Sequence, residues 1–412
     1  MNLANVRSAI GLTIAPAALI AVAVAALLAL RLAGLGFEGD PLAVLVDAPD
    51  RLREIADRRG SVVGVSLLAW LVAFGVAMAV NREHVGRVAA RLLALSLAYL
   101  PLVLLATAAL EPEMGMERLL LMLGAPALAS VTLLALGGYR ALAFACGATV
   151  LAYTVDVVAG SPLTRLSLVG PNPAAGHRFY GIGNELEAIL VVLTLVGTGA
   201  ALSTFWVPWD RESRKRRLGA RGPAAFLVVA AVLAFVFAYG RYGADVGAAI
   251  TLPLGAAVAA ALLAGRPRLA LLALLLPLPA LAILSAADLL TGSNAHLTRT
   301  VLQADGGRDV LAVFGHRLRE AGESFGRPLL IPGLPVVIAS AALAWLRRDR
   351  IAAWLRGVPP MRAGLAGALA ATLVGTLAND SGALLLEIGA AYLVVFVGFA
   401  WAEADDQRGR YP

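Results

Sequence analysis

Long apolar runs recur along almost the whole chain, and they limit the folds that it can adopt. A membrane-spanning helix needs about 20 predominantly apolar residues to cross a hydrocarbon core of about 30 Å. One run of this kind extends from Ala188 to Phe205. The chain is also 60% hydrophobic and only 15% charged, whereas soluble proteins are about 45–50% apolar and about 25% charged. The sequence therefore predicts an all-α, polytopic membrane helix bundle and excludes a large soluble core.

We predict about twelve transmembrane helices in a single transmembrane domain that covers residues 1–412. The predicted spans are 10–30, 61–80, 88–110, 119–137, 141–159, 187–206, 224–240, 246–264, 269–288, 328–346, 363–378 and 383–402. We expect the first span to be retained as a membrane helix, because no small-residue cleavage site followed by a soluble domain is evident. Residues 289–327 are predicted to form an extracytoplasmic loop subdomain.

The arginines between the spans predict the orientation of the chain, because short cytoplasmic loops are enriched in Lys and Arg. The loop from Arg211 to Arg221 is the most basic of these loops, and we place it in the cytoplasm. Both termini are then cytoplasmic. The outer side receives the connections that hold the polar motifs, namely 160–186, 241–245, 289–327 and 379–382. We expect a multi-pass protein of the bacterial cytoplasmic (inner) membrane.

Charge and cysteine content exclude several classes of function. The net charge of +7 does not indicate nucleic acid binding, because the arginines are scattered between apolar segments where they set orientation. The single cysteine, Cys146, lies in an apolar run and can form no disulfide within the chain. The sequence also contains no glycine-rich phosphate loop with Lys, no HExxH and no GxSxG. We therefore expect no metal, no cofactor and no nucleic acid partner.

The first polar motif, His177–Glu187 (HRFYGIGNELE), directly precedes a long apolar run. Ionisable groups at the mouth of a membrane helix are costly, and they usually serve a function. A purely structural interpretation is also open, since Asn184 can cap the helix and the helix dipole favours Glu185 near its N-terminus. Capping does not explain His177 and Arg178, which together suit a phosphate or carboxylate ligand.

The second motif, Tyr239–Gly247, joins two predicted spans almost without a loop. Arg241 and Asp245 are four residues apart and can form a local ion pair. An exposed pair of this kind contributes only about 0.2–0.5 kcal/mol, whereas a charge at mid-membrane costs at least about 2.5–3.5 kcal/mol. If Asp245 lies below the membrane surface, it therefore needs a further partner or a ligand.

Two more polar motifs follow in the predicted outer connections. In Asn294–Arg299, His296 and Arg299 are three residues apart and share one face of a helix. A solvated, inert histidine is the alternative interpretation. In Asn379–Gly382, Asp380 is either an N-terminal helix cap or part of a site.

The segments RFYGIGNE, RYGADVG, NAHLTR and NDSG occur in this order over residues 150–400. This set resembles a bacterial family of polytopic membrane proteins, some of whose members carry an alkaline-phosphatase-like domain in the same chain. Such a domain is absent from this sequence. The resemblance therefore implies that any partner hydrolase is a separate chain.

A second resemblance is to the O-antigen ligase and polymerase superfamily. Arg178 with Gly181 and Asn184 is similar to its first motif. Arg241 with Gly243 is loosely similar to its Arg-Gly-Ala turn, and His296 matches its outer-loop histidine. This resemblance implies that the arginines bind the pyrophosphate of a polyprenyl-linked sugar donor, while His296 or a carboxylate assists glycosyl transfer. The extra acids Glu185 and Asp245 depart from the superfamily pattern.

Two classes of function fit these motifs, and a membrane scaffold for envelope enzymes is a third. The first is a glycosyl or related group transferase that acts on an anionic, polyprenyl-phosphate-linked cell-envelope intermediate. Its candidate catalytic residues are Glu185, Asp245 and His296, and its candidate substrate-binding residues are His177, Arg178, Asn184, Arg241, Arg299, Asn379 and Asp380.

The second class is a proton- or Na⁺-coupled transporter or flippase of an anionic lipid substrate. Its candidate coupling acids are Glu185, Asp245, Asp380 and Glu387. We favour the transferase because the polar motifs gather on one side, although the sequence leaves open whether the chain is an enzyme. Expected partners are membrane lipids, a lipid-linked glycan and a separate envelope hydrolase or transferase.

Overall fold

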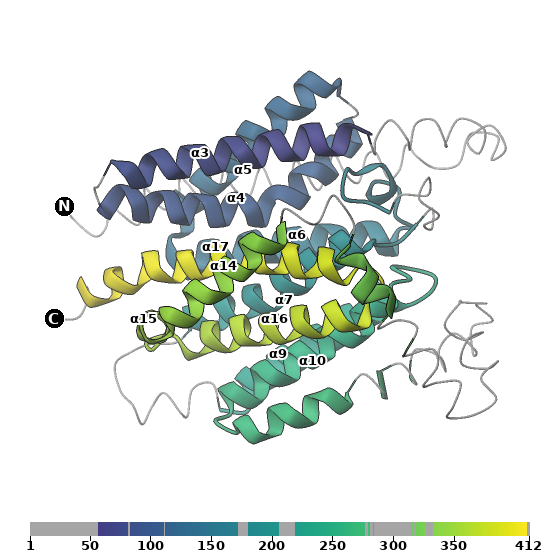
Figure 1. Cartoon of the computed structure of the whole chain (residues 1–412), viewed down its shortest axis with the longest axis vertical. Coiled ribbons are helices and arrows are strands. Elements are labelled where there is room, and N and C mark those ends of the chain that lie inside the picture. The colour runs from purple at the N-terminus through teal and green to yellow at the C-terminus, as the bar shows by residue number, and fades with distance from the viewer. Residues whose placement is uncertain are drawn as a thin grey trace. The chain divides into compact units, whose positions relative to one another are not determined.

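The computed structural model of the chain is built from helices (Figure 1). It describes residues 57–80, 83–110, 112–171, 180–205, 219–276, 319–326 and 333–409, together with residues 279, 280, 283 and 315. Within these ranges, nine helices are long and apolar enough to cross a membrane, and no strand occurs. The prediction of an all-α membrane helix bundle is confirmed to this extent.

Nine predicted spans correspond to these nine helices. They are Asp57–Ala79, Glu83–Leu110, Met114–Leu136, Gly138–Val158, Asn184–Thr204, Arg221–Ala238, Val246–Leu263, Pro359–Ala378 and Gly382–Ala404. Two other predicted spans contain shorter helices, the 3₁₀ helix η4 (Pro267–Leu275) and α14 (Gly333–Leu346). The span 10–30 lies outside the described residues, as do the first and last residues of the chain. The number of twelve spans and the location of the termini therefore remain predictions.

The chain divides into two compact units, Met1–Tyr180 and Gly181–Pro412. The described part of the first unit contains the π-helix η1 (Gly60–Gly64), α3 (Val65–Ala79), α4 (Glu83–Leu110), α5 (Met114–Leu136), α6 (Gly138–Val158) and the 3₁₀ helix η2 (Thr164–Leu166). Helix α4 packs against α3, α5 and α6, and it is the most deeply buried of the four. It therefore forms the centre of this unit.

Hydrogen bonds from α6 reach two backbone carbonyl groups beside a proline inside α4. Pro101 has no N–H and therefore interrupts the backbone hydrogen bonds of α4. The Thr149 hydroxyl donates to the Ala98 carbonyl at 2.8 Å, and the Tyr153 hydroxyl donates to the Pro101 carbonyl at 2.9 Å. Backbone groups inside a bilayer need such partners, since no water is present to replace them. These two bonds consequently fix α6 against α4.

Asp156 has a structural role at the end of α6. Its carboxylate accepts hydrogen bonds from the Leu163 N–H at 3.0 Å, from the Thr164 N–H at 2.8 Å and from the Thr164 hydroxyl at 2.6 Å. The side chain is buried. These bonds satisfy the carboxylate and hold the turn that leads from α6 into η2.

The described part of the second unit contains α7 (Asn184–Thr204), α9 (Arg221–Ala238), α10 (Val246–Leu263), η4, α14, α15 (Arg348–Trp354), α16 (Pro359–Ala378) and α17 (Gly382–Gly409). Helix α16 packs against α7, α10 and α17. Glycines permit this close packing. A Cβ atom at Gly364 would lie 2.6 Å from the Leu195 carbonyl oxygen, and one at Gly255 would lie 2.8 Å from the Gly367 carbonyl oxygen. Small residues of this kind allow membrane helices to approach each other closely.

A short part of the predicted outer loop lies against the start of α17. The Ser324 hydroxyl accepts a hydrogen bond from the Ala383 N–H at 2.9 Å, and it donates to the Ala321 carbonyl at 2.6 Å. Most of the predicted subdomain 289–327 lies outside the described residues. The described segment nevertheless stabilises the turn between α16 and α17.

Candidate functional site

The start of α7 and the turn between α9 and α10 are joined through their backbones. The Ile182 N–H donates a hydrogen bond to the Gly243 carbonyl at 3.0 Å. Gly181 has a φ of +82°, and a Cβ atom at this position would collide with Gly243. Only glycine combines this backbone conformation with such a close contact. The glycines of the first two polar motifs therefore bring these motifs together.

The turn between α16 and α17 adds a network of amide side chains. Asn184 Nδ2 donates to Asp380 Oδ1 at 3.1 Å. Asn379 Nδ2 donates to Asn184 Oδ1 at 3.2 Å, while Asn379 Oδ1 accepts the Ser381 N–H at 3.0 Å. Three segments that are distant in the sequence thus meet at one end of the second unit. Because α7 begins here and α16 ends here, the helices themselves bring these groups together.

Glu187 lies at the centre of this network, in the first turn of α7. Its Oε2 atom accepts a hydrogen bond from Asn379 Nδ2 at 3.0 Å, and its Oε1 atom accepts one from Thr251 Oγ1 at 3.0 Å. The side chain is only 1% exposed. Gly247 provides the space that it occupies, since a Cβ atom there would collide with the carboxylate. Residues of α10 and of the turn between α16 and α17 consequently determine the position of this buried carboxyl group of α7.

Asp245 contributes a second carboxyl group and also starts α10. It is the N-terminal cap of this helix, and its Oδ1 atom accepts the Gly247 N–H at 3.3 Å. The side chain is buried, and its carboxyl group interacts electrostatically with that of Glu187. Two carboxylates in contact repel each other, so such a pair is stable when it shares a proton or binds a cation. The pair can therefore take up and release positive charge.

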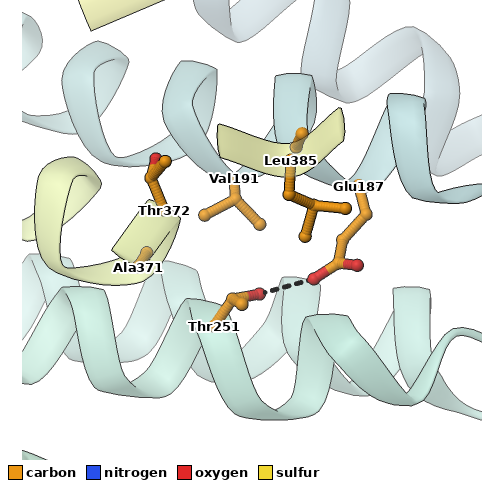
Figure 2. Close-up of a pocket in the computed structure, with 7 residues that line it drawn as sticks. Glu187, Val191, Thr251, Ala371, Thr372 and Leu385 are labelled. Atoms are coloured by element: carbon orange, nitrogen blue, oxygen red, sulfur yellow. Dashed lines mark hydrogen bonds between the residues drawn. The ribbon is translucent and has the colours of Figure 1, made fainter. Parts of the chain in front are cut away.

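A small pocket begins at Glu187 and extends between the helices, away from the polar turns (Figure 2). Figure 2 shows Glu187 at one end of the pocket, with Thr251 bonded to it, and Thr372 at the other end. Aliphatic side chains from α7, α16 and α17 form the remaining walls. Among the described residues, no group of three or more His, Cys, Asp or Glu side chains is arranged to hold a metal ion.

The structure brings together four of the predicted site residues, which are Asn184, Asp245, Asn379 and Asp380. Glu185 is half-buried in the first turn of α7, and Arg241 is exposed on the turn before α10. The other predicted residues, His177, Arg178, His296 and Arg299, lie outside the described residues. The intramembrane acid Glu387 lies one turn into α17, where its carboxylate is against Gly333 of α14.

One structural interpretation made from the sequence needs correction, and the polar network extends beyond the predicted site residues. Asn184 does not cap α7, because Gly183 occupies the cap position and the Asn184 side chain reaches Asp380 instead. The polar network also contains Glu187 and Thr251, which the predicted site omitted. Glu187 follows Asn184 by three residues and therefore shares its helix face. That spacing was the available signal, whereas nothing in the sequence distinguished Thr251 from other membrane threonines.

Comparison with family models, with curated protein sequences and with solved structures finds no match to this chain. The two resemblances inferred from its motifs therefore remain expectations.

Proposed function

We propose that this membrane protein is a transporter or flippase that couples the binding of a proton or small cation at Glu187 to the movement of an anionic substrate. The observation that supports this proposal most directly is the position of Glu187 inside a membrane-length helix, 1% exposed and next to Asp245. A buried acid in a membrane is costly to keep and is a functional candidate by default. Here the side chain is held by neutral donors, Asn379 and Thr251.

Burial favours an ion as the ligand of this carboxylate. A catalytic base has to come within hydrogen-bonding distance of the hydroxyl group from which it removes a proton. Glu187 is enclosed by its neighbours and does not offer such access to a bulky acceptor. A proton or a small cation needs only a narrow path, and it neutralises the charge that makes burial unfavourable.

The anionic substrate is inferred from the arginines of the polar motifs. Arg241 is exposed on the turn that leads into Asp245. Arg178 and Arg299 belong to motifs next to the same predicted connections. Arginine suits phosphate because its guanidinium group can donate two parallel hydrogen bonds. A polyprenyl phosphate of the bacterial cell envelope is the substrate class that we propose.

One observation favours the transferase as a second candidate. The acids and amides described above gather at a single end of the second unit, with Glu185 half-buried and Arg241 exposed beside them. A transporter with alternating access is expected to carry polar groups toward both sides of the membrane. A one-sided site is typical of an enzyme that receives a lipid-linked donor from one leaflet.

The two candidates are separated by reconstituting the full-length chain in vesicles with a fluorescent short-chain polyprenyl phosphate. For a coupled transporter, an imposed proton or Na⁺ gradient should accelerate movement of the probe between leaflets by about tenfold or more. Glu187→Gln should abolish this acceleration, because the amide cannot exchange a proton and carries no charge. Asp349→Asn, which alters an exposed acid on α15, is the matched control and should behave like the wild type.

Two results would contradict the transporter. In the first, the gradient has no effect on the wild-type chain. In the second, Glu187→Gln retains the full gradient effect. If the same vesicles instead transfer a glycan from a polyprenyl diphosphate donor, and Arg241→Ala abolishes that transfer, the second candidate is correct.

A further inference from the structure

The connection between α14 and α16 has more arginines than any other described connection of the second unit. It contains the short helix α15, which packs against α14 and α17 (Figure 1). Asp349 is the only acid between Trp345 and Arg362. The same segment contains five arginines, all of them exposed, which are Arg347, Arg348, Arg350, Arg356 and Arg362. Five positive charges and one negative charge thus lie on one surface, far in the sequence from Glu187.

Helix α15 separates its apolar side chains from its charged ones. Leu355, which directly follows the helix, is buried, and Ile351 and Trp354 are half-buried. These three residues share one helix face, because side chains three and four positions apart lie next to each other. Arg348 and Arg350 of the same helix are exposed. The helix is therefore held to the protein by its apolar face while its guanidinium groups remain accessible.

Helix α14 provides an apolar surface beside these arginines. None of its residues is buried, and Trp345 and Leu346 at its end are 70% and 74% exposed. In a helix of a membrane protein, such side chains contact the acyl chains of lipids. Tryptophan is enriched where the hydrocarbon meets the lipid headgroups. The arginines that directly follow Trp345 are therefore expected at the level of the headgroups.

Trp345 also positions one of the arginines. The Arg348 Cζ atom lies 5.0 Å from the centroid of the Trp345 ring, and Arg348 Nη1 donates to the Trp345 carbonyl at 3.1 Å. The ring attracts the guanidinium through a cation–π interaction. The guanidinium groups of the other four arginines form no hydrogen bond or ion pair with any described residue. Their donors are available to an external anion.

We propose that this surface, formed by the five arginines with Trp345 and Leu346, binds the phosphate headgroup of an anionic phospholipid whose acyl chains lie along α14. Guanidinium groups suit phosphate because they can donate two parallel hydrogen bonds. Clusters of arginine directly next to a membrane helix attract anionic lipids, and each additional basic residue strengthens the attraction. This lipid surface does not depend on the proposed transport function.

Arginines beside a membrane helix also set its orientation, which requires only their charge. The connection between α10 and η4 is an example of this simpler case. Its two arginines, Arg266 and Arg268, are exposed on either side of Pro267, and no described aromatic ring lies against them. The combination of clustered arginines with an exposed tryptophan distinguishes the α15 surface from such a connection.

Thermal unfolding of the purified full-length chain in non-ionic detergent tests the proposal. A ligand that binds only the folded state raises the Tm. Saturating short-chain phosphatidylglycerol should raise it by about 2–4 °C over short-chain phosphatidylcholine, whose headgroup has no net charge. sn-Glycerol 3-phosphate should give no such increase, because it lacks the acyl chains that contact α14.

Variants locate the bound lipid. The combined substitutions Arg347→Gln, Arg348→Gln and Arg350→Gln should raise the phosphatidylglycerol concentration for half the Tm increase by about tenfold or more. Lysine at the same three positions should largely restore binding, since it retains the charge. The matched control combines Arg266→Gln and Arg268→Gln, and it should behave like the wild type.

Each of three results overturns the proposal. In the first, phosphatidylglycerol and phosphatidylcholine raise the Tm equally. In the second, sn-glycerol 3-phosphate reproduces the full increase, which would make the ligand a free phosphate and not a lipid. In the third, the glutamine variant of α15 and the control variant require the same lipid concentration, so that the arginines of α15 are no different from others at the membrane surface.

Discussion

Glu185 and Glu187 show how the helix separates two similar residues. Both lie in the first turn of α7, but a step of two residues rotates the side chain to the other side of a helix. Glu185 is half-buried, whereas Glu187 points into the unit and receives hydrogen bonds from Asn379 and Thr251. The sequence predicted the motif, but the packing of α10 and α16 selected which of its two acids is enclosed.

Asn379 provides the clearest test of the network at the residue scale. Its amide donates to Asn184 and Glu187, while its oxygen accepts the Ser381 N–H. Asn379→Asp keeps the shape and the acceptor but replaces the two donors with a further negative charge. We expect it to lower the free energy of unfolding by about 2–4 kcal/mol, because buried acceptors lose their partners and like charges meet. The measurement is thermal unfolding in detergent.

The control for this variant is Asp380→Asn, which keeps an oxygen that can accept from Asn184 and removes one negative charge. It should destabilise the chain much less. Equal effects of the two substitutions would mean that the donors of Asn379 are not important for stability.

At the scale of elements, the glycines of α16 determine how closely the helices of the second unit pack. Gly364 and Gly367 of α16 lie against the backbones of α7 and α10 respectively. This close approach places the end of α16, and with it the turn at Asn379, next to the start of α7. The polar network therefore depends on residues that have no polar side chain.

Gly364→Ala should consequently affect both packing and site. A Cβ atom there would lie 2.6 Å from the Leu195 carbonyl oxygen, so α16 and α7 would have to separate. We expect a loss of about 1–3 kcal/mol in the free energy of unfolding, as for other overpacked positions. Gly398→Ala on α17 is the matched control, because a Cβ atom there meets nothing within 4 Å. A Gly364→Ala chain as stable as this control would show that α16 and α7 can accommodate the added methyl group without losing stability.

At the scale of the whole molecule, the predicted orientation in the membrane is based on the positions of the arginines between the spans. Helix α10 places the turn with Arg241 at one end and the turn with Arg266 at the other. Its 18 residues are about 27 Å long at 1.5 Å per residue, close to the thickness of the hydrocarbon core. The orientation derived from arginine assigns the first turn to the outside and the second to the cytoplasm.

Single cysteines can test this orientation, because the only native cysteine, Cys146, is buried and can be replaced by serine. In that background, Arg241→Cys should react with a membrane-impermeant maleimide on intact cells. Arg266→Cys should react only after the membrane is opened, although both positions are exposed in the structure. The reverse pattern would invert the orientation, and labelling of both on intact cells would mean that α10 does not span the membrane.

The sequence by itself determined the class of the protein and the approximate limits of nine membrane-length helices. It could do so because burying an unpaired backbone in lipid is so unfavourable that long apolar runs have to form helices. It also predicted the polar segments around Asn184, Asp245 and Asn379 as parts of one site. Only the tertiary structure showed that Glu187 is the centre of the polar network, that Thr251 is bonded to it and that a pocket continues to Thr372. Those facts depend on contacts between helices distant in sequence, and the close packing allowed by glycines such as Gly247 and Gly364 decides which side chains meet.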